Sequence, residues 1–218
     1  VQADSDRRDI GVFETGISAQ RHGDNIESPR DAAVAECIRL IETAKSNNLY
    51  VPKQDWDQYG DRKRLPSGES IVYLSNDQTT ITKIRNPLAK AAIKNLNPAD
   101  MIYEHLIHNI FFPNTRYTFA GISEDIDGVR IILRQPYIPM KFISPSQKQI
   151  DRYIVDFLGL EKENSYFYGN SMISITDINA EGDNVLVDSE GTLYFIDPII
   201  KLKKRATEVL DYYYPMCV

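Results

Sequence analysis

The sequence predicts an α+β fold in which antiparallel hairpins alternate with a few amphipathic helices. Apolar, β-branched runs occur in pairs separated by turn-forming residues, which is typical of β-hairpins. Between these pairs, apolar side chains recur every three to four residues in segments that begin with capping residues, which is typical of helices. A chain of 218 residues is long enough to bury the core of one compact unit with two small lobes.

The N-terminal part is predicted to be an arm followed by a helix. Residues 1–27 are polar and lack sustained periodicity, so we expect an extended or wrapping segment. Ser28-Pro29-Arg30-Asp31 resembles a capping box. The helix that follows would carry an apolar face formed by Val34, Cys37, Ile38 and Ile41. We expect it to pack on the neighbouring sheet, with Trp56 as a packing anchor.

A first hairpin is predicted over residues 68–84. Gly68 leads an apolar run, Ser75-Asn76-Asp77 has turn chemistry, and a second β-rich run follows. Lys83 lies near the end of this second strand. A lone lysine in a strand is ordinarily a solvated edge residue.

A helix is predicted next, with Asn97 as the N-cap and Pro113 ending it. By the three-to-four residue period, Glu104 shares a partly apolar face with His108 and Phe111. A carboxylate buried on such a face would be costly without a cation beside it. The alternative is that Glu104 is an exposed helix charge.

A second hairpin is predicted to join Tyr117–Ser123 to Val129–Gln135 through an acidic turn. The segment Gln135-Pro136-Tyr137-Ile138-Pro139 then forms a stiff, extended connector, because two prolines restrict the backbone. Ser144-Pro145 is predicted to begin a further helix that ends at Gly159.

The region between Asp177 and Pro198 places oxygen-bearing side chains around one short hairpin. Val185–Val187 and Leu193–Ile196 are apolar runs that flank a turn. Because the outer ends of an antiparallel pair are neighbours, Asn184 and Asp197 would reach the same ion. Mg²⁺ is typically held by one or two carboxylates together with phosphate oxygens, so this pair suits it.

Two alternatives are considered for this region. Several side chains fall near the ligand positions of a calcium-binding EF-hand loop: Asp177, Asn179, Glu181, Gly182 and Asp188. Against the EF-hand, Asn184 stands where an apolar residue is expected, Asp188 where Glu is expected, and a strand-like run follows where a helix is required. The other alternative is a surface hairpin with acidic turns.

In order and in residue type, these segments resemble the protein-kinase-like superfamily. They are most similar to the compact kinase domains of polyvalent proteins from phages and mobile elements, and the Ile-Asp-Pro ending at Pro198 is similar to aminoglycoside and other small-molecule kinases. The resemblance implies a reduced two-lobed fold. It would consist of an N-terminal arm and helix at 1–65, an antiparallel-sheet small lobe at 66–135, and a truncated helical large lobe at 136–218.

The resemblance implies a catalytic and metal-binding group in the third hairpin. Asp177 matches the base that orients or deprotonates an acceptor hydroxyl, and Asn184 and Asp197 match the residues that bind Mg²⁺. Six residues separate Asp177 from Asn184 where the family has four. Ile175-Thr176 replaces the usual His-Arg, and Asp197-Pro198-Ile199 replaces Asp-Phe-Gly.

The resemblance also implies an ATP-binding group in the small lobe. Lys83 matches the strand lysine that contacts the α- and β-phosphates, and Glu104 matches the helix glutamate that pairs with it. Gly68 stands where the family often has three glycines, so the phosphate-covering loop is reduced. Gln135 and Tyr137 belong to the segment that matches the hinge, whose backbone groups bind the adenine.

The predicted activity is ATP- and Mg²⁺-dependent transfer of a γ-phosphate to a hydroxyl of a protein or small-molecule acceptor. The competing hypothesis is a nucleotide-binding or inert pseudokinase that acts as an interaction module, which the altered loop around Asp177 favours. Only about twenty residues follow Asp197, so we expect no room for the activation segment and later helices of a full large lobe.

Composition bounds the remaining possibilities. A net charge of −6 argues against a general nucleic-acid binder. No apolar run of membrane-spanning length and no apolar signal segment occur, so the cytoplasm is expected. Cys37 and Cys217 are too few for a disulfide scaffold. Because the chain starts with Val1, we expect a processed protein or a domain of a longer polypeptide. A basic cluster follows Asp197, formed by Lys201, Lys203, Lys204 and Arg205. We expect it to begin a solvated helix, and the alternative is that it contacts a phosphate or an acidic substrate.

Overall fold

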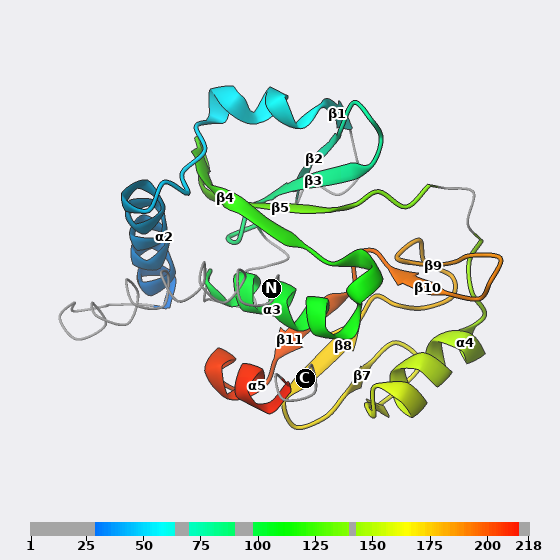
Figure 1. Ribbon diagram of the computed structural model, residues 1–218. Helices are drawn as coiled ribbons and strands as arrows, with labels where there is room; N and C mark the ends of the chain where they lie inside the picture. The colour runs from blue at the N-terminus through cyan, green and yellow to red at the C-terminus, as the bar shows by residue number, and fades with distance from the viewer. Residues whose placement is uncertain (1–28, 64–69, 90–97, 140–142, 214–218) are drawn as a thin grey trace. The chain divides into compact units, whose positions relative to one another are not determined.

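The computed structural model describes residues 29–63, 70–89, 98–139 and 143–213 (Figure 1). The described residues form two compact units. The first holds those up to Ile102 together with Thr118–Tyr137, and the second holds Tyr103–Tyr117 together with those from Ile138 onward. Helices and antiparallel sheets occur together, so the predicted α+β class is confirmed. The predicted domain limits at 65/66 and 135/136 remain predictions.

The first unit is built on an antiparallel sheet whose described strands follow the order β1-β2-β3-β5-β4 (Figure 1). The strands are β1 (Asp61–Lys63), β2 (Ser70–Leu74), β3 (Thr80–Arg85), β4 (Thr118–Asp125) and β5 (Gly128–Pro136). β2 pairs with β3, and β4 pairs with β5, as the two predicted hairpins require. β3 also pairs with β5, which makes β3 an interior strand.

Helix α2 (Pro29–Ser46) packs against β4 and β5, so both the predicted helix and its packing on the sheet are confirmed. The predicted apolar face is wrong except at Cys37. Val34 and Ile38 are exposed, and Ile41 is only half-buried. The buried stripe is formed by Ala33, Cys37, Leu40 and Ala44. These four positions share one helix face, and the larger β-branched side chains beside them obscured this stripe in the sequence.

Trp56 is the packing anchor that its sequence position indicated. It lies in the short helix η1 (Lys53–Tyr59) and is buried with Tyr73, Ile84 and Ile132. Its indole Nε1 donates a hydrogen bond to Ser123 Oγ at 3.0 Å. The apolar ring is therefore packed while its one polar atom is satisfied.

The second unit contains most of α3 (Asp100–Phe111) and several short helices, which are η2 (Pro113–Thr115), α4 (Gln147–Asp151), its π-helical continuation η3 (Arg152–Phe157), and α5 (Ala206–Tyr213). A sheet of described strands runs in the order β11-β8-β7-β6, formed by β6 (Glu161–Lys162), β7 (Tyr168–Gly169), β8 (Ile173–Thr176) and β11 (Ile199–Leu202). A separate hairpin pairs β9 (Val185–Val187) with β10 (Leu193–Phe195).

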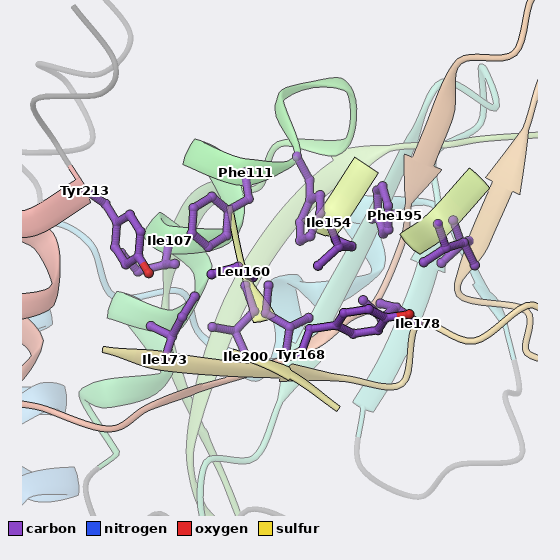
Figure 2. Packing of buried hydrophobic residues seen from close by; sticks show 14 of the residues in the cluster. Ile107, Phe111, Ile154, Leu160, Tyr168, Ile173, Ile178, Phe195, Ile200 and Tyr213 are labelled. Atoms are coloured by element: carbon purple, nitrogen blue, oxygen red, sulfur yellow. The ribbon is translucent and has the colours of Figure 1, made fainter. Parts of the chain in front are cut away.

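The core of this second unit gathers side chains from nearly every one of these elements. Figure 2 shows Phe111 of α3, Ile154 of η3 and Phe195 of β10 directed into one cluster with Ile173 of β8 and Ile200 of β11. All are almost completely buried. Burial of this apolar surface supplies the main stabilising free energy of the unit and fixes where the β9–β10 hairpin sits.

Three local predictions are corrected or fall outside the described residues. Helix α4 is capped by Ser146 instead of Ser144, because Gln149 lies three residues after Ser146 and completes a capping box. Lys201 lies in β11, and the helix after it begins only at Ala206. Asn97, the predicted N-cap of α3, lies outside the described residues. No helix in the described part of the chain is long and apolar enough to cross a membrane.

Candidate functional site

The β9–β10 hairpin brings Asn184 and Asp197 to adjacent ends of one strand pair. Phe195 lies opposite Val185 in the register, and both side chains are buried in the core of the second unit. The Ile196 amide then donates to the Asn184 carbonyl at 2.7 Å. Asp197 follows directly, so main-chain pairing brings the two predicted metal ligands together as the sequence indicated.

Asn184 is also bound to Asp177. Its side-chain Nδ2 donates to the Asp177 carboxylate Oδ2 at 2.7 Å and to the Asp177 carbonyl at 3.2 Å. Because the amide nitrogen is committed to Asp177, the amide oxygen Oδ1 is directed elsewhere and can accept a hydrogen bond or bind a cation. Asp177 itself is exposed and has a backbone φ of 63°, in the left-handed region that non-glycine residues rarely adopt.

The loop between Asp177 and Asn184 is closed by hydrogen bonds of its own. Asn179 Oδ1 accepts from the Glu181 amide at 3.1 Å, which is an Asx-turn. Gln147 Oε1 of α4 accepts from the Ala180 amide at 3.0 Å and ties the loop to that helix. The two residues by which this loop exceeds the kinase pattern are therefore accommodated in an ordered turn.

The EF-hand alternative is wrong. An EF-hand loop is flanked by helices, whereas β8 precedes this loop and β9 follows it. The strand-like run after Asn184, which already opposed the EF-hand in the sequence, is the feature that the structure bears out.

Asp197 receives a contact that the sequence did not indicate. The Tyr117 hydroxyl lies 3.0 Å from the Ile196 carbonyl and 3.3 Å from Asp197 Oδ1. Tyr117 is buried, at 4% exposure, although the sequence assigned it only to the start of a strand. The signal in the sequence was a tyrosine within an apolar segment, since a buried tyrosine hydroxyl usually finds a hydrogen-bond partner.

The described residues that were predicted to bind nucleotide in the small lobe lie in or beside the sheet of the first unit. They are Lys83, Gln135 and Tyr137. Lys83 lies in the interior strand β3 and is 5% exposed, so it is not the solvated edge residue considered as the alternative. Gln135 is buried opposite Ile81. The Tyr137 amide donates to the Thr79 carbonyl at 2.8 Å, so this amide is engaged just beyond the paired ends of β3 and β5.

For two predicted site residues, Glu104 and Gly68, the structure does not test the predicted role. Glu104 lies on α3, half-buried, in the second unit, and its pairing with Lys83 of the first unit stays a prediction. Its predicted face is right at His108 and Phe111, which are both buried. Gly68, predicted to cover the phosphates, lies outside the described residues.

The donor set around the hairpin fits a hard cation that is shared with a phosphate ligand. Asn184 offers an amide oxygen and Asp197 a carboxylate, and Mg²⁺ bound to a nucleotide needs only one or two carboxylates from the protein. Among the residues that the structure describes, no three His, Cys, Asp or Glu side chains form a cluster that could hold a metal ion.

Comparisons with known proteins identify a family. A family model described as a serine/threonine/tyrosine kinase found in polyvalent proteins matches residues 34–204, which span both units and all eight predicted site residues. A search of curated proteins and a search of solved structures gave no match. The resemblance to polyvalent-protein kinases is thereby confirmed, and the chain belongs to the family of serine/threonine/tyrosine kinases found in polyvalent proteins.

Proposed function

We propose that this protein transfers the γ-phosphate of ATP, with Mg²⁺, to a hydroxyl group of a protein or small-molecule acceptor. The observation that carries the proposal is the hydrogen bond from Asn184 Nδ2 to Asp177 Oδ2 at 2.7 Å, beside the hairpin end that leads to Asp197. One local cluster thus offers a carboxylate for the acceptor, and an amide oxygen and a second carboxylate for a cation. Membership of a kinase family supports the same conclusion.

Asp177 is suited to meet the acceptor. Its side chain is exposed, and its hydrogen bond to Asn184 uses Oδ2, which leaves Oδ1 to accept the proton of an incoming hydroxyl. The orientation of the carboxylate is set by Asn184 and by the left-handed backbone at Asp177. In phosphoryl transfer, positioning and charge stabilisation supply most of the rate enhancement, so a base held in this way is sufficient.

Asn184 Oδ1 and Asp197 would hold Mg²⁺. When bound, the ion would neutralise charge on the transferring phosphates. Lys83 would place a second positive charge at the α- and β-phosphates, with Glu104 as its partner. A buried ammonium group needs such partners, since burial of an isolated charge is costly.

The connector after β5 would bind the adenine through its main chain. In extended backbone, successive residues direct their polar groups to opposite sides. Because the Tyr137 amide faces Thr79, the Pro136 carbonyl and the Ile138 amide would lie on the other side. A carbonyl and an amide two residues apart offer the acceptor and the donor that one edge of adenine requires. The roles proposed for Gln135 and Tyr137 are then to support this connector.

A pseudokinase is the second candidate function. One Asp177 oxygen is occupied by Asn184, and the loop between them is two residues longer than in active protein kinases. A protein of this kind would bind Mg²⁺-ATP without transferring phosphate and would act through its interactions with a partner.

The test combines nucleotide binding with phosphate transfer. Calorimetry should detect ATP binding that is tighter with Mg²⁺ than with EDTA, and phosphate incorporation should be measured across protein and small-molecule acceptors. Asp177→Asn is expected to lower transfer by about 10²–10⁴-fold with ATP affinity little changed, because Asp177 meets the acceptor and not the nucleotide. Asp183→Asn, an exposed carboxylate in the same loop, is the matched control and should keep activity.

The outcomes separate the candidates. Clear Mg²⁺-ATP binding by a wild-type protein that transfers no more phosphate than Asp177→Asn would support the pseudokinase. Absence of any Mg²⁺-ATP binding or thermal stabilisation at millimolar nucleotide would contradict both, because a ligand that binds only the folded state must stabilise it.

A further inference from the structure

Both the main chain and the ring of Tyr117 are held by side chains of the preceding helix α3. A single buried side chain, Asn109 of α3, binds both of its main-chain polar groups. Asn109 Oδ1 accepts from the Tyr117 amide at 2.6 Å, and Asn109 Nδ2 donates to the Tyr117 carbonyl at 2.7 Å. Asn109 therefore takes the place of a strand partner and fixes the backbone of Tyr117 to α3.

The ring of Tyr117 is fixed as well. The imidazole rings of His105 and His108, also on α3, lie against it with ring centroids 4.7 Å away in each case. With the backbone bound and two imidazole rings packed against the side chain, little rotamer freedom is left to it. Its hydroxyl is therefore delivered to a set position.

That position is the end of β10, where Asp197 begins. The phenol has a single proton, and its oxygen lies 3.0 Å from the Ile196 carbonyl and 3.3 Å from Asp197 Oδ1, both of which can accept it. A hydrogen bond to a carboxylate is charge-assisted and is stronger than one to a carbonyl. Contact with Oδ1 restrains rotation of the carboxylate.

We propose that Tyr117 is a positioning residue for the carboxylate of Asp197, set by Asn109 so that its hydroxyl orients that carboxylate toward Mg²⁺. This inference rests on the proposed metal-binding role of Asp197. Carboxylates that bind metals are themselves commonly hydrogen-bonded, and loss of such a partner typically costs 10–100-fold in metal affinity or activity. Mg²⁺ demands near-ideal octahedral geometry, so a carboxylate free to rotate holds it less well.

The test removes one hydroxyl at a time. Tyr117→Phe keeps the ring contacts with both histidines and deletes only the hydroxyl. Tyr153→Phe is the matched control, because Tyr153 lies in the same unit, packs on Phe195 of β10, and donates its hydroxyl to the Phe111 carbonyl at 2.7 Å. Each protein is titrated with ATP at a series of Mg²⁺ concentrations and in EDTA, and its unfolding temperature is recorded without ligand.

Tyr117→Phe is expected to raise the Mg²⁺ concentration for half-maximal effect on ATP affinity by about 10-fold, with ATP affinity in EDTA unchanged. Tyr153→Phe should leave the Mg²⁺ dependence at the wild-type value. In an Asp197→Asn background, Tyr117→Phe should add no further change, because the two residues act through one interaction.

Three results would overturn the inference. They are an unchanged Mg²⁺ dependence in Tyr117→Phe, an equal change in Tyr153→Phe, or full additivity with Asp197→Asn. If the ATP affinity of the wild-type protein does not change with Mg²⁺ concentration, the proposed function itself is contradicted, and with it the role of Tyr117. The two failures are thus distinguished within one experiment.

Discussion

The buried hydroxyl of Thr115 offers the sharpest test of how the second unit holds the end of β10. Thr115 is 0% exposed, and its Oγ1 donates to the Phe195 carbonyl at 2.7 Å. The Ile196 amide faces Asn184 across the hairpin, so the Phe195 carbonyl points away from β9 and toward Thr115. Together with the bond from the Tyr117 hydroxyl to the Ile196 carbonyl, this hydrogen bond links the segment after α3 to the strand that leads into Asp197.

Thr115→Val removes the hydroxyl and nearly preserves the shape of the side chain. The Phe195 carbonyl would remain buried without its hydroxyl partner, which costs about 1–3 kcal/mol. Two longer contacts of Oγ1, both at 3.3 Å, add little to the loss. The Phe112 carbonyl keeps its bond from the Thr115 amide at 3.1 Å, and His108 Nε2 keeps its contact with the Thr115 carbonyl at 3.0 Å. We expect about 2 kcal/mol in the free energy of unfolding, or a fall of roughly 4–8 °C in Tm for a chain of this size.

Urea and thermal unfolding, followed by circular dichroism, measure this loss. The control is Thr118→Val, which makes the same chemical change at an exposed position of β4 and should stay within about 0.5 kcal/mol of wild type. If Thr115→Val is no less stable than Thr118→Val, the hydroxyl does not anchor the Phe195 carbonyl and the reasoning is refuted.

Two further predictions concern the rest of the fold. Gly121 and Gly128 both have positive φ, at 139° and 110°, but a Cβ at Gly121 would lie 2.6 Å from the Leu49 carbonyl oxygen, whereas one at Gly128 meets nothing within 4 Å. Gly121→Ala should therefore have a lower free energy of unfolding than Gly128→Ala, by about 1 kcal/mol or more in urea unfolding. Equal losses of stability would mean that the positive φ alone causes them and that the Leu49 carbonyl contact adds nothing. Burial raises the pKa of Asp151. Hydrogen bonds from Gln147, Lys162 and Tyr168 outweigh this effect, so the pKa lies below its ordinary value. A lowered folded-state pKa means that folding favours the charged carboxylate. The free energy of unfolding of wild type should therefore exceed that of Asp151→Asn fully above about pH 5, and the difference should disappear as the pH falls through the folded-state pKa, below about pH 4. A difference that stays constant between about pH 6 and pH 3 would contradict this.

The elements with a clear periodic pattern were predictable from the sequence. Alternating apolar runs bounded by turn residues identified the β2–β3, β4–β5 and β9–β10 hairpins, and the capping residues and periodicity identified α2 and α3. The register of β9 with β10 follows from the same pattern, since a slip of one residue in either strand would expose its buried side chain, Val185 in β9 or Phe195 in β10. Adjacent placement of Asn184 and Asp197 was therefore a consequence of local sequence.

The sheet β11-β8-β7-β6 was not predictable in the same way. Its strands are short, between two and four residues in the described chain, and pairing between such strands depends on distant partners. β11 carries Lys201, whose charge favoured a solvated helix start, yet Lys201 pairs in register with Ser174 of β8. Tertiary pairing overrode the local signal there.

The contribution of Tyr117 could not be read from the sequence for a related reason. Its hydroxyl reaches a group some eighty positions later in the chain, and its orientation depends on Asn109. Neither tyrosine nor asparagine forms a spacing that indicates a metal site. Long-range polar contacts of this kind become visible only when the two segments are seen together.

Main-chain pairing, more than any side chain, determines how the two aspartates of the candidate site are held. Asp177 directly follows β8, and Asp197 lies two residues before β11, whose first residue, Ile199, pairs with Thr176 of β8. The backbone leaving Asp197 is therefore bonded to the backbone entering Asp177, while Asn184 bridges both through the Ile196 amide and its own side chain. Side-chain contacts such as that of Tyr117 then need only orient carboxylates whose backbones are already fixed, which is why single hydroxyl deletions can test the site without unfolding it.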